Sequence, residues 1–135
     1  MKTKSLVFLL ICILAVSCSD KDELPLDFNS LVGTIWEGKL EETSTSGHVL
    51  KAYEVRIEFT AEDYGYCVVI PCEEAAEKQQ FDYEFNGMNE MLINMNNVGT
   101  CPFEGRYDLI KSNSKYMVWE KFAVNSLILT LYKKN

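Results

Sequence analysis

Histidine is almost absent from this sequence, and other common ingredients of active sites are missing altogether. His48 is the only histidine, and the Ser, Thr and Gly residues of the turn-like run 43–48 offer it no rigid catalytic neighbours. The chain has no Cys-x-x-Cys pair, no calcium-type loop and no glycine-rich phosphate loop. We therefore expect no catalytic residues, no metal site, no cofactor and no enzymatic activity.

Basic residues are also scarce. The 135 residues include 13 Lys and Arg against 20 Asp and Glu, which gives a net charge of −7. Basic residues form no stripe with interleaved aromatics, so the composition argues against a nucleic-acid partner. The acidic charge favours solubility and would suit a cationic partner.

No apolar run is long enough to span a membrane as a helix. The longest, 6–16, has about eleven residues and follows Lys2 and Lys4. A positive start, a short apolar stretch and the small residue Ser17 are the three parts of a secretory signal. We expect residues 1–17 to be a signal peptide.

A cysteine directly follows this signal. The run Leu14-Ala15-Val16-Ser17-Cys18 resembles the lipobox of bacterial lipoproteins, in which the cysteine sulfur receives a diacylglycerol before cleavage. The resemblance implies lipidation of Cys18 and anchoring to the membrane through its acyl chains. Residues 18–28 then form an acidic flexible tether, and residues 29–135 form the folded domain.

The tether begins with a cluster of charges, Ser19-Asp20-Lys21-Asp22-Glu23. This cluster resembles the signal that sends some Gram-negative lipoproteins to the outer face of the outer membrane, although a plain polar tether has the same composition. We expect a lipid-anchored protein of the bacterial outer membrane, and the acidic cluster favours exposure at the cell surface.

Alternation of apolar and polar residues dominates the rest of the chain. It predicts a short helical turn after Asp27 and then eight short strands. The strands are expected at 33–41, 53–59, 64–71, 81–85, 91–95, 103–110, 116–122 and 126–132. The third is unusual because the run Tyr66-Cys67-Val68-Val69-Ile70 is apolar on both faces, so its outer side is either covered or sticky.

No segment is long enough to be a helix connecting parallel strands. The pattern therefore predicts an all-β domain, an antiparallel meander that forms either a sandwich or a small up-and-down barrel. A barrel of eight strands encloses room for side chains or for one small ligand.

Both ends of the domain resemble the small lipocalin-like lipoproteins of Gram-negative bacteria. The likeness lies in Gly33-Thr34-Ile35-Trp36-Glu37-Gly38 and in the closing run 127–134. It implies a lipocalin-like barrel with Trp36 as a plug at one end. It also implies either the binding of a small apolar molecule or no known function.

The inward-facing side chains give two readings of function. Eight of them are candidates for a ligand pocket in the barrel interior: Trp36, Tyr53, Val55, Ile57, Phe59, Tyr83, Phe85 and Tyr107. The same side chains could fill a small barrel completely. The first reading gives a binding protein for a small hydrophobic ligand. The second gives an interaction protein, for example a hydrolase inhibitor, that acts through its barrel-end loops.

Three cysteines fall within the folded domain. In a meander, Cys72 at the end of the third strand and Cys101 before the sixth lie at the same end, whereas Cys67 lies roughly 16 Å from Cys72 along the strand. An exported protein enters an oxidising compartment, so we predict a Cys72–Cys101 disulfide with Cys67 free. Three free thiols are the alternative.

Overall fold

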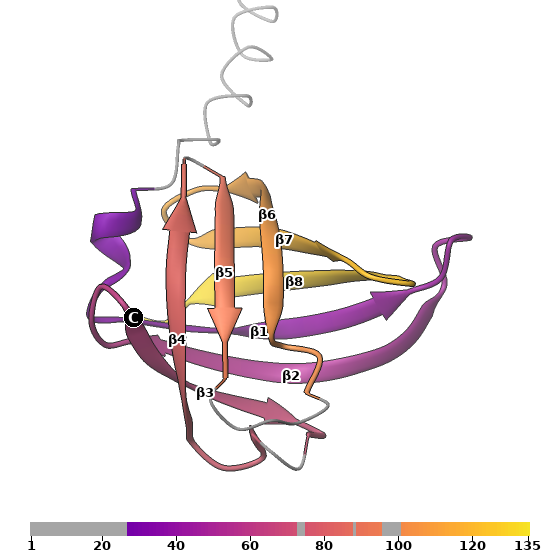
Figure 1. Ribbon diagram of the computed structural model, residues 1–135, viewed down its shortest axis with the longest axis horizontal. Helices are drawn as coiled ribbons and strands as arrows, with labels where there is room; N and C mark the ends of the chain where they lie inside the picture. Colours follow the sequence, from indigo (N-terminus) through magenta and orange to yellow (C-terminus); the bar gives the residue numbers. More distant parts are fainter. Residues whose placement is uncertain (1–26, 73–74, 88, 96–100) are drawn as a thin grey trace, which may run out of the picture.

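Eight antiparallel strands close into a barrel in the computed structural model, which describes residues 27–72, 75–87, 89–95 and 101–135 (Figure 1). The strands are β1 (Thr34–Thr43), β2 (Val49–Phe59), β3 (Tyr64–Ile70), β4 (Gln79–Asn86), β5 (Glu90–Asn94), β6 (Gly105–Ser112), β7 (Tyr116–Phe122) and β8 (Ser126–Lys133). Each strand pairs with its neighbour in sequence, and β1 closes the sheet by pairing with β8 from Trp36↔Lys133 to Thr43↔Ser126. The predicted meander is confirmed, and of the two predicted architectures the chain forms the barrel.

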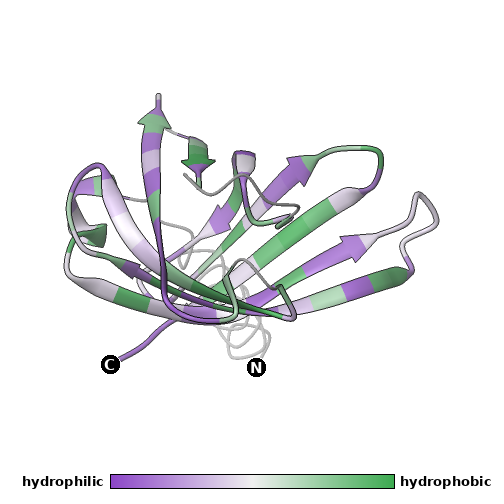
Figure 2. Cartoon of the chain, turned by 60° about the horizontal axis from the view of Figure 1, so that its bottom comes forward, coloured by the Kyte–Doolittle hydropathy of each residue, from purple (hydrophilic) through white to green (hydrophobic). Residues whose placement is uncertain are grey.

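Residues that alternate along the strands face the barrel interior and the outer surface in turn. Figure 2 shows hydrophobic and hydrophilic residues alternating along the strands. The largest fully buried side chains include Trp119, Tyr107, Phe59, Phe81 and Phe103. Their rings contact one another; for example, the centroids of Phe81 and Phe103 lie 5.5 Å apart, edge to face. Aromatic packing therefore fills much of the interior.

Strand bounds differ from the predicted ones mainly in two places. The β1–β2 hairpin is longer than expected, because pairing continues to Glu42↔Lys51 and Thr43↔Val49 through a bulge. Strand β6 begins at Gly105, whereas the sequence predicted a start at Phe103. Phe103 is fully buried from the loop before the strand, so its apolar character reflects packing and not pairing.

We call one end of the barrel the entry end, because residues 27–33 reach the barrel there before β1 begins. The predicted turn after Asp27 is a 3-10 helix, η2 (Phe28–Leu31), whose first turn is capped by the Asp27 carboxylate accepting from the Asn29 amide at 3.0 Å. Leu31 is buried, and Phe28 packs against the core. The short helix thus seals the entry end.

The opposite end, the loop end, carries the turns 44–48 and 123–125 and the connections that follow β3 and β5. Cys72, Ala75, Cys101 and Phe103 are buried from these connections. Tyr107 donates to the Phe103 carbonyl at 2.7 Å and so ties one connection to the barrel wall. Both ends of the barrel are therefore covered by parts of the chain.

Strand β1 comes unusually close to β8 at Gly38. A Cβ atom added there would lie 1.8 Å from the backbone carbonyl oxygen of Thr130. Only glycine permits this approach, which lets the sheet curve sharply beside the barrel's closing seam.

Candidate functional site

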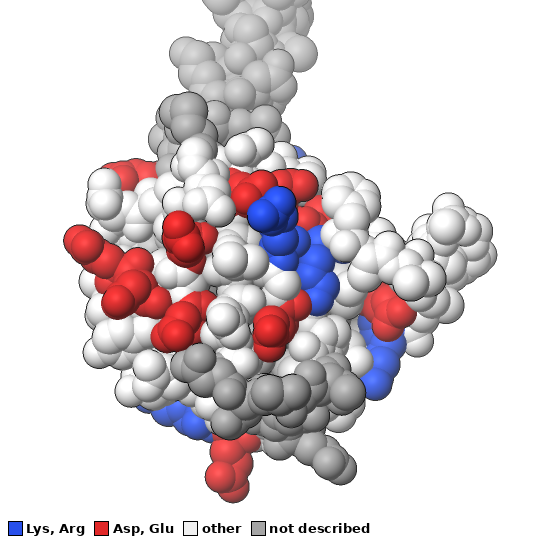
Figure 3. Space-filling model, in the orientation of Figure 1, with Lys and Arg blue, Asp and Glu red and all other residues white. Residues whose placement is uncertain are grey.

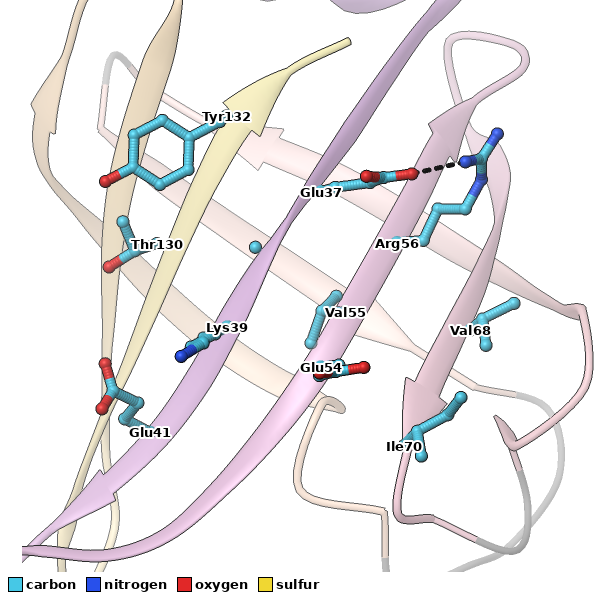
Figure 4. A pocket seen from close by; sticks show the side chains of 11 residues that line it. Glu37, Lys39, Glu41, Glu54, Val55, Arg56, Val68, Ile70, Thr130 and Tyr132 are labelled. Atoms are coloured by element: carbon cyan, nitrogen blue, oxygen red, sulfur yellow. Dashed lines mark hydrogen bonds and ion pairs between the residues drawn. The ribbon is translucent and has the colours of Figure 1, made fainter.

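A groove lies on the outer surface of the barrel, across β8, β1, β2 and β3 (Figure 4). It has a volume of about 880 Å³ and is open to solvent along its length. Its lining residues come from these four neighbouring strands: Glu37, Gly38, Lys39, Glu41, Glu54, Val55, Arg56, Val68, Ile70, Thr130 and Tyr132. Most belong to the polar, outward-facing half of the alternating pattern, so the same rule that fills the interior also builds the groove.

Opposite charges face each other across the floor of the groove. Glu37 lies directly across from Arg56, and Lys39 lies across from Glu54. Arg56 Nη1 contacts Glu37 Oε1 at 2.5 Å, and Lys134 Nζ contacts Glu37 Oε2 at 3.2 Å. Lys134 and Arg56 together hold the pKa of Glu37 below its ordinary value. The carboxylate of Glu37 is therefore compensated by the charges of Arg56 and Lys134.

Other charges of the groove have no such partner. Within the described part of the chain, Lys39, Glu41 and Glu54 form no ion pair. Two carboxylates and one ammonium are therefore available to groups from outside. Val68 and Ile70 provide an apolar wall beside them (Figure 4).

At the loop end, the groove face terminates in exposed apolar residues that we call the apolar margin: Val49, Leu50, Phe122 and Val124. The strand register places Phe122 opposite Ser126, Ser126 opposite Thr43, and Thr43 opposite Val49. These four positions form one row across β7, β8, β1 and β2. Phe122 and Val124 keep 70% and 97% of their surface exposed.

Hydrogen bonds hold the β1–β2 and β7–β8 hairpin ends, which carry the apolar margin, side by side. Asn125 Nδ2 donates to Glu42 Oε1 at 2.7 Å, and Thr43 Oγ1 donates to the Ser126 carbonyl at 3.3 Å. The turn 44–48 is also closed internally, because the His48 amide donates to Ser44 Oγ at 3.2 Å. His48 itself is exposed.

The structure places the eight predicted pocket residues on the interior side of the barrel wall. Seven of them are covered almost completely, with 0–5% of their surface exposed: Trp36, Tyr53, Val55, Ile57, Phe59, Tyr83 and Tyr107. Phe85 is the exception, being only partly buried. A ligand-sized cavity would leave uncovered surface on the side chains around it, and these seven have almost none.

Cys67, Cys72 and Cys101 are buried, and the predicted Cys72–Cys101 disulfide is not formed in this structure. Burial raises the pKa of Cys67 to about 12, with smaller contributions from Cys101 and Cys72. The predicted free state of Cys67 agrees with the structure. Cys18 lies outside the described residues.

A lysine ties the loop before β6 to the barrel near these thiols. Lys121 Nζ donates to the carbonyls of Pro102 and Glu104 at 2.5 Å each. Burial lowers the pKa of the Lys121 ammonium, against the opposing effects of Cys101 and Glu104. Because its hydrogen bonds go to backbone carbonyls, this lysine has a structural task.

The described residues contain no cluster of three or more potential metal ligands. Among these described residues there is also no helix with the length and apolar character needed to cross a membrane.

Sequence reasoning missed the groove, although one signal for it was present. The third strand is apolar on both faces, and its outward residues Val68 and Ile70 line the groove wall. The curvature that hollows the surface depends on how four strands bend together, which alternation along one strand does not record.

No family model, no curated protein and no solved structure matches this chain.

Proposed function

We propose that this chain is a lipid-anchored protein of the bacterial outer membrane whose lipocalin-like barrel binds a partner protein through the groove and its apolar margin. One observation carries the proposal. Nine large apolar side chains are exposed among the described residues, and six belong to the groove or the margin: Val49, Leu50, Ile70, Phe122, Val124 and Tyr132. Apolar residues gathered on one surface, with polar residues around them, are typical of interaction sites.

The anchoring part of the proposal depends on Cys18 and its lipobox-like context. Acyl chains on this residue would hold the protein at the membrane, and the acidic cluster after it supports exposure at the cell surface. The described chain starts at the entry end, whereas the margin lies at the loop end. A partner can therefore reach the margin from the side of the barrel opposite the point where the tether joins.

The exposed apolar residues of the margin and the carboxylates of the groove both indicate what kind of partner would bind. Covering one large apolar side chain completely contributes about 1.5–3 kcal/mol to binding, so Phe122 and Val124 are the expected anchors. Glu41 and Glu54 form no ion pair with any described residue, and they favour basic groups on the partner. A cationic hydrolase that this protein inhibits fits these requirements.

A small hydrophobic ligand in the barrel interior is the other function that the sequence suggests. It has less support, because seven of the eight candidate lining residues have almost no free surface. Such a ligand would have to displace fully buried rings such as those of Phe59 and Tyr107 before it could bind.

Site-specific photocrosslinking in the producing cells tests partner binding. We expect a benzoylphenylalanine residue in place of Val124 to crosslink one defined protein, and one in place of Ile110 to crosslink none. Ile110 is a suitable control because it is also exposed but lies on β6, away from the groove. Equal crosslinking from both positions would contradict the proposal.

Matched double variants give the energetic test with the captured partner. Phe122→Ser with Val124→Ser should weaken binding about tenfold or more, because two apolar contacts are lost. Leu92→Ser with Ile110→Ser, on the opposite face, should leave the affinity unchanged.

The anchor and the disulfide are tested separately. Cys18→Ser should abolish labelling by a palmitate analogue and release the protein from the membrane fraction, and continued labelling would refute lipidation at this residue. The Cys72–Cys101 bridge stays a prediction for the exported protein. Intact-mass analysis after alkylation without reductant should show one alkylated thiol in the domain, and a bridge that contains Cys67 would refute the pairing.

A further inference from the structure

Among the described residues, one buried side-chain nitrogen has no hydrogen-bond partner: the indole nitrogen of Trp119. The side chain is fully buried, and its N–H finds no acceptor among the described residues. The other tryptophan behaves normally, since Trp36 Nε1 donates to Thr34 Oγ1 at 2.8 Å. A buried donor without a partner costs about 1–3 kcal/mol, so Trp119 calls for a physical explanation.

Trp119 belongs to a stack of three aromatic rings near the entry end. The rings of Phe28 and Phe85 are parallel, with an interplanar angle of 1° and centroids 4.0 Å apart. The Trp119 ring lies 6.2 Å from Phe85 and 6.5 Å from Phe28, tilted by less than 30° from both. Phe28 comes from η2, Phe85 from β4 and Trp119 from β7. Together they pack aromatic rings in stacked orientations.

The stack leads from the surface into the core. Phe28 and Phe85 are only partly buried, whereas Trp119 is completely covered. Phe28 sits on a single turn of 3-10 helix, and such short turns are held by few hydrogen bonds. Its ring is therefore the member of the stack that can leave most easily.

We propose that the Phe28–Phe85–Trp119 stack is a binding site for a planar heteroaromatic molecule with a neutral hydrogen-bond acceptor. The molecule takes the place of the Phe28 ring on Phe85 and presents its acceptor to the Trp119 N–H. A fused second ring reaches further towards Trp119 than the phenyl ring of Phe28 does. This site lies at the entry end and is separate from the partner-binding surface proposed above.

Two probes of the same shape test the hydrogen bond. Quinoline carries a ring nitrogen that accepts, and naphthalene has the same two fused rings without it. We expect quinoline to bind at least about fivefold more tightly, because it satisfies the buried donor. Equal affinity for the two probes, or no binding of either, would overturn the proposal.

Nitrogen-15 NMR of the two indole groups locates the probe. Quinoline should shift the Trp119 indole signal downfield and leave the Trp36 signal in place, because Trp36 already has its acceptor. A shift of the Trp36 signal alone, or equal shifts of both, would place the probe elsewhere and refute the site.

Two phenylalanine variants complete the test. Phe28→Ala should tighten quinoline binding about tenfold, since the competing ring is gone. Phe122→Ala, a matched change at the loop end, should leave quinoline binding unchanged while it weakens partner binding. If Phe28→Ala leaves the quinoline affinity unchanged or weakens it, Phe28 does not occupy the slot and the proposal is wrong.

Discussion

The two outer faces of the barrel follow the same alternating pattern but distribute their charges differently. On the groove face, strand register sets Glu37 opposite Arg56 and Lys39 opposite Glu54. On the face formed by β4, β5 and β6, which we call the acidic face, Glu90 lies opposite Asp108 and Asp108 lies opposite Glu120 of β7. Figure 3 shows acidic side chains spread over this second face.

This difference indicates separate tasks for the two faces. Carboxylates directly opposite one another repel, so the acidic row Glu90–Asp108–Glu120 weakens the sheet slightly. Arg106 is the one cation among the outward-facing residues that precede Lys111 on the described strands β4 to β6. Its Nε lies 3.5 Å from Glu90 Oε1. A repulsive, strongly hydrated face resists association, whereas the charge-balanced groove face with its apolar margin permits it.

The largest expected effect comes from the backbone of the groove face. Gly38→Ala places a methyl group against the Thr130 carbonyl, where no side-chain movement can make room. We expect the free energy of unfolding to fall by about 3 kcal/mol. Urea denaturation measures the change, and Lys39→Ala, one residue along and pointing outward, should cost far less. A Gly38→Ala protein as stable as the natural one would show that β1 does not need this close approach to β8.

Reversing one charge should introduce on the groove face the cross-strand repulsion between carboxylates that the acidic face has. Arg56→Glu sets two carboxylates opposite each other, so we expect a loss of stability at low ionic strength that is smaller than that of Gly38→Ala. The loss should shrink in 1 M salt, where the Debye length is about 3 Å. An equal loss at both salt concentrations would mean that the arginine stabilises by packing instead of by charge.

Neutralising the centre of the acidic row should do the opposite. Asp108→Asn removes both cross-strand repulsions and should raise the free energy of unfolding by about 0.5 kcal/mol. Glu54→Gln on the groove face removes a carboxylate that faces Lys39 but forms no ion pair with any described residue, so the free energy of unfolding should change little. Thermal unfolding of the two variants side by side measures the contrast, and a loss of stability in Asp108→Asn would contradict the assigned repulsion.

The smallest effect concerns acid pH. The folded pKa of Glu37 lies below the unfolded value of 4.5, so its contribution to stability is complete above pH 4.5 and is lost as pH falls through the folded pKa. Glu37→Gln should therefore flatten the stability profile below pH 4.5 and leave its shape at neutral pH unchanged. Denaturation curves between pH 2 and pH 7 test this, and identical profiles for both proteins would show that the pair with Lys134 and Arg56 is too solvent-exposed to matter.

Much of the fold was readable because alternation has a physical cause. A strand with one face in the core must alternate, so eight strands and their inward residues could be predicted from positions such as Tyr53 and Val55. The extra length of the hairpin could not be predicted, since Val49 and Leu50 are both exposed, Val49 pairs with Thr43 only through the backbone, and Leu50 lies at the bulge. Phe103 misled the prediction because burial from a loop has the same sequence signature as burial from a strand.

The sequence by itself determined an export signal's composition, an all-β meander and the set of side chains that face inward, because each depends on local order along the chain. Only the tertiary structure decided that β1 closes the sheet against β8, that Glu37 meets Arg56 while Glu90 meets Asp108, and that the Trp119 indole has no acceptor among the described residues. Register, curvature and contact between distant strands arise from packing all eight strands around one core, and no single segment carries that information.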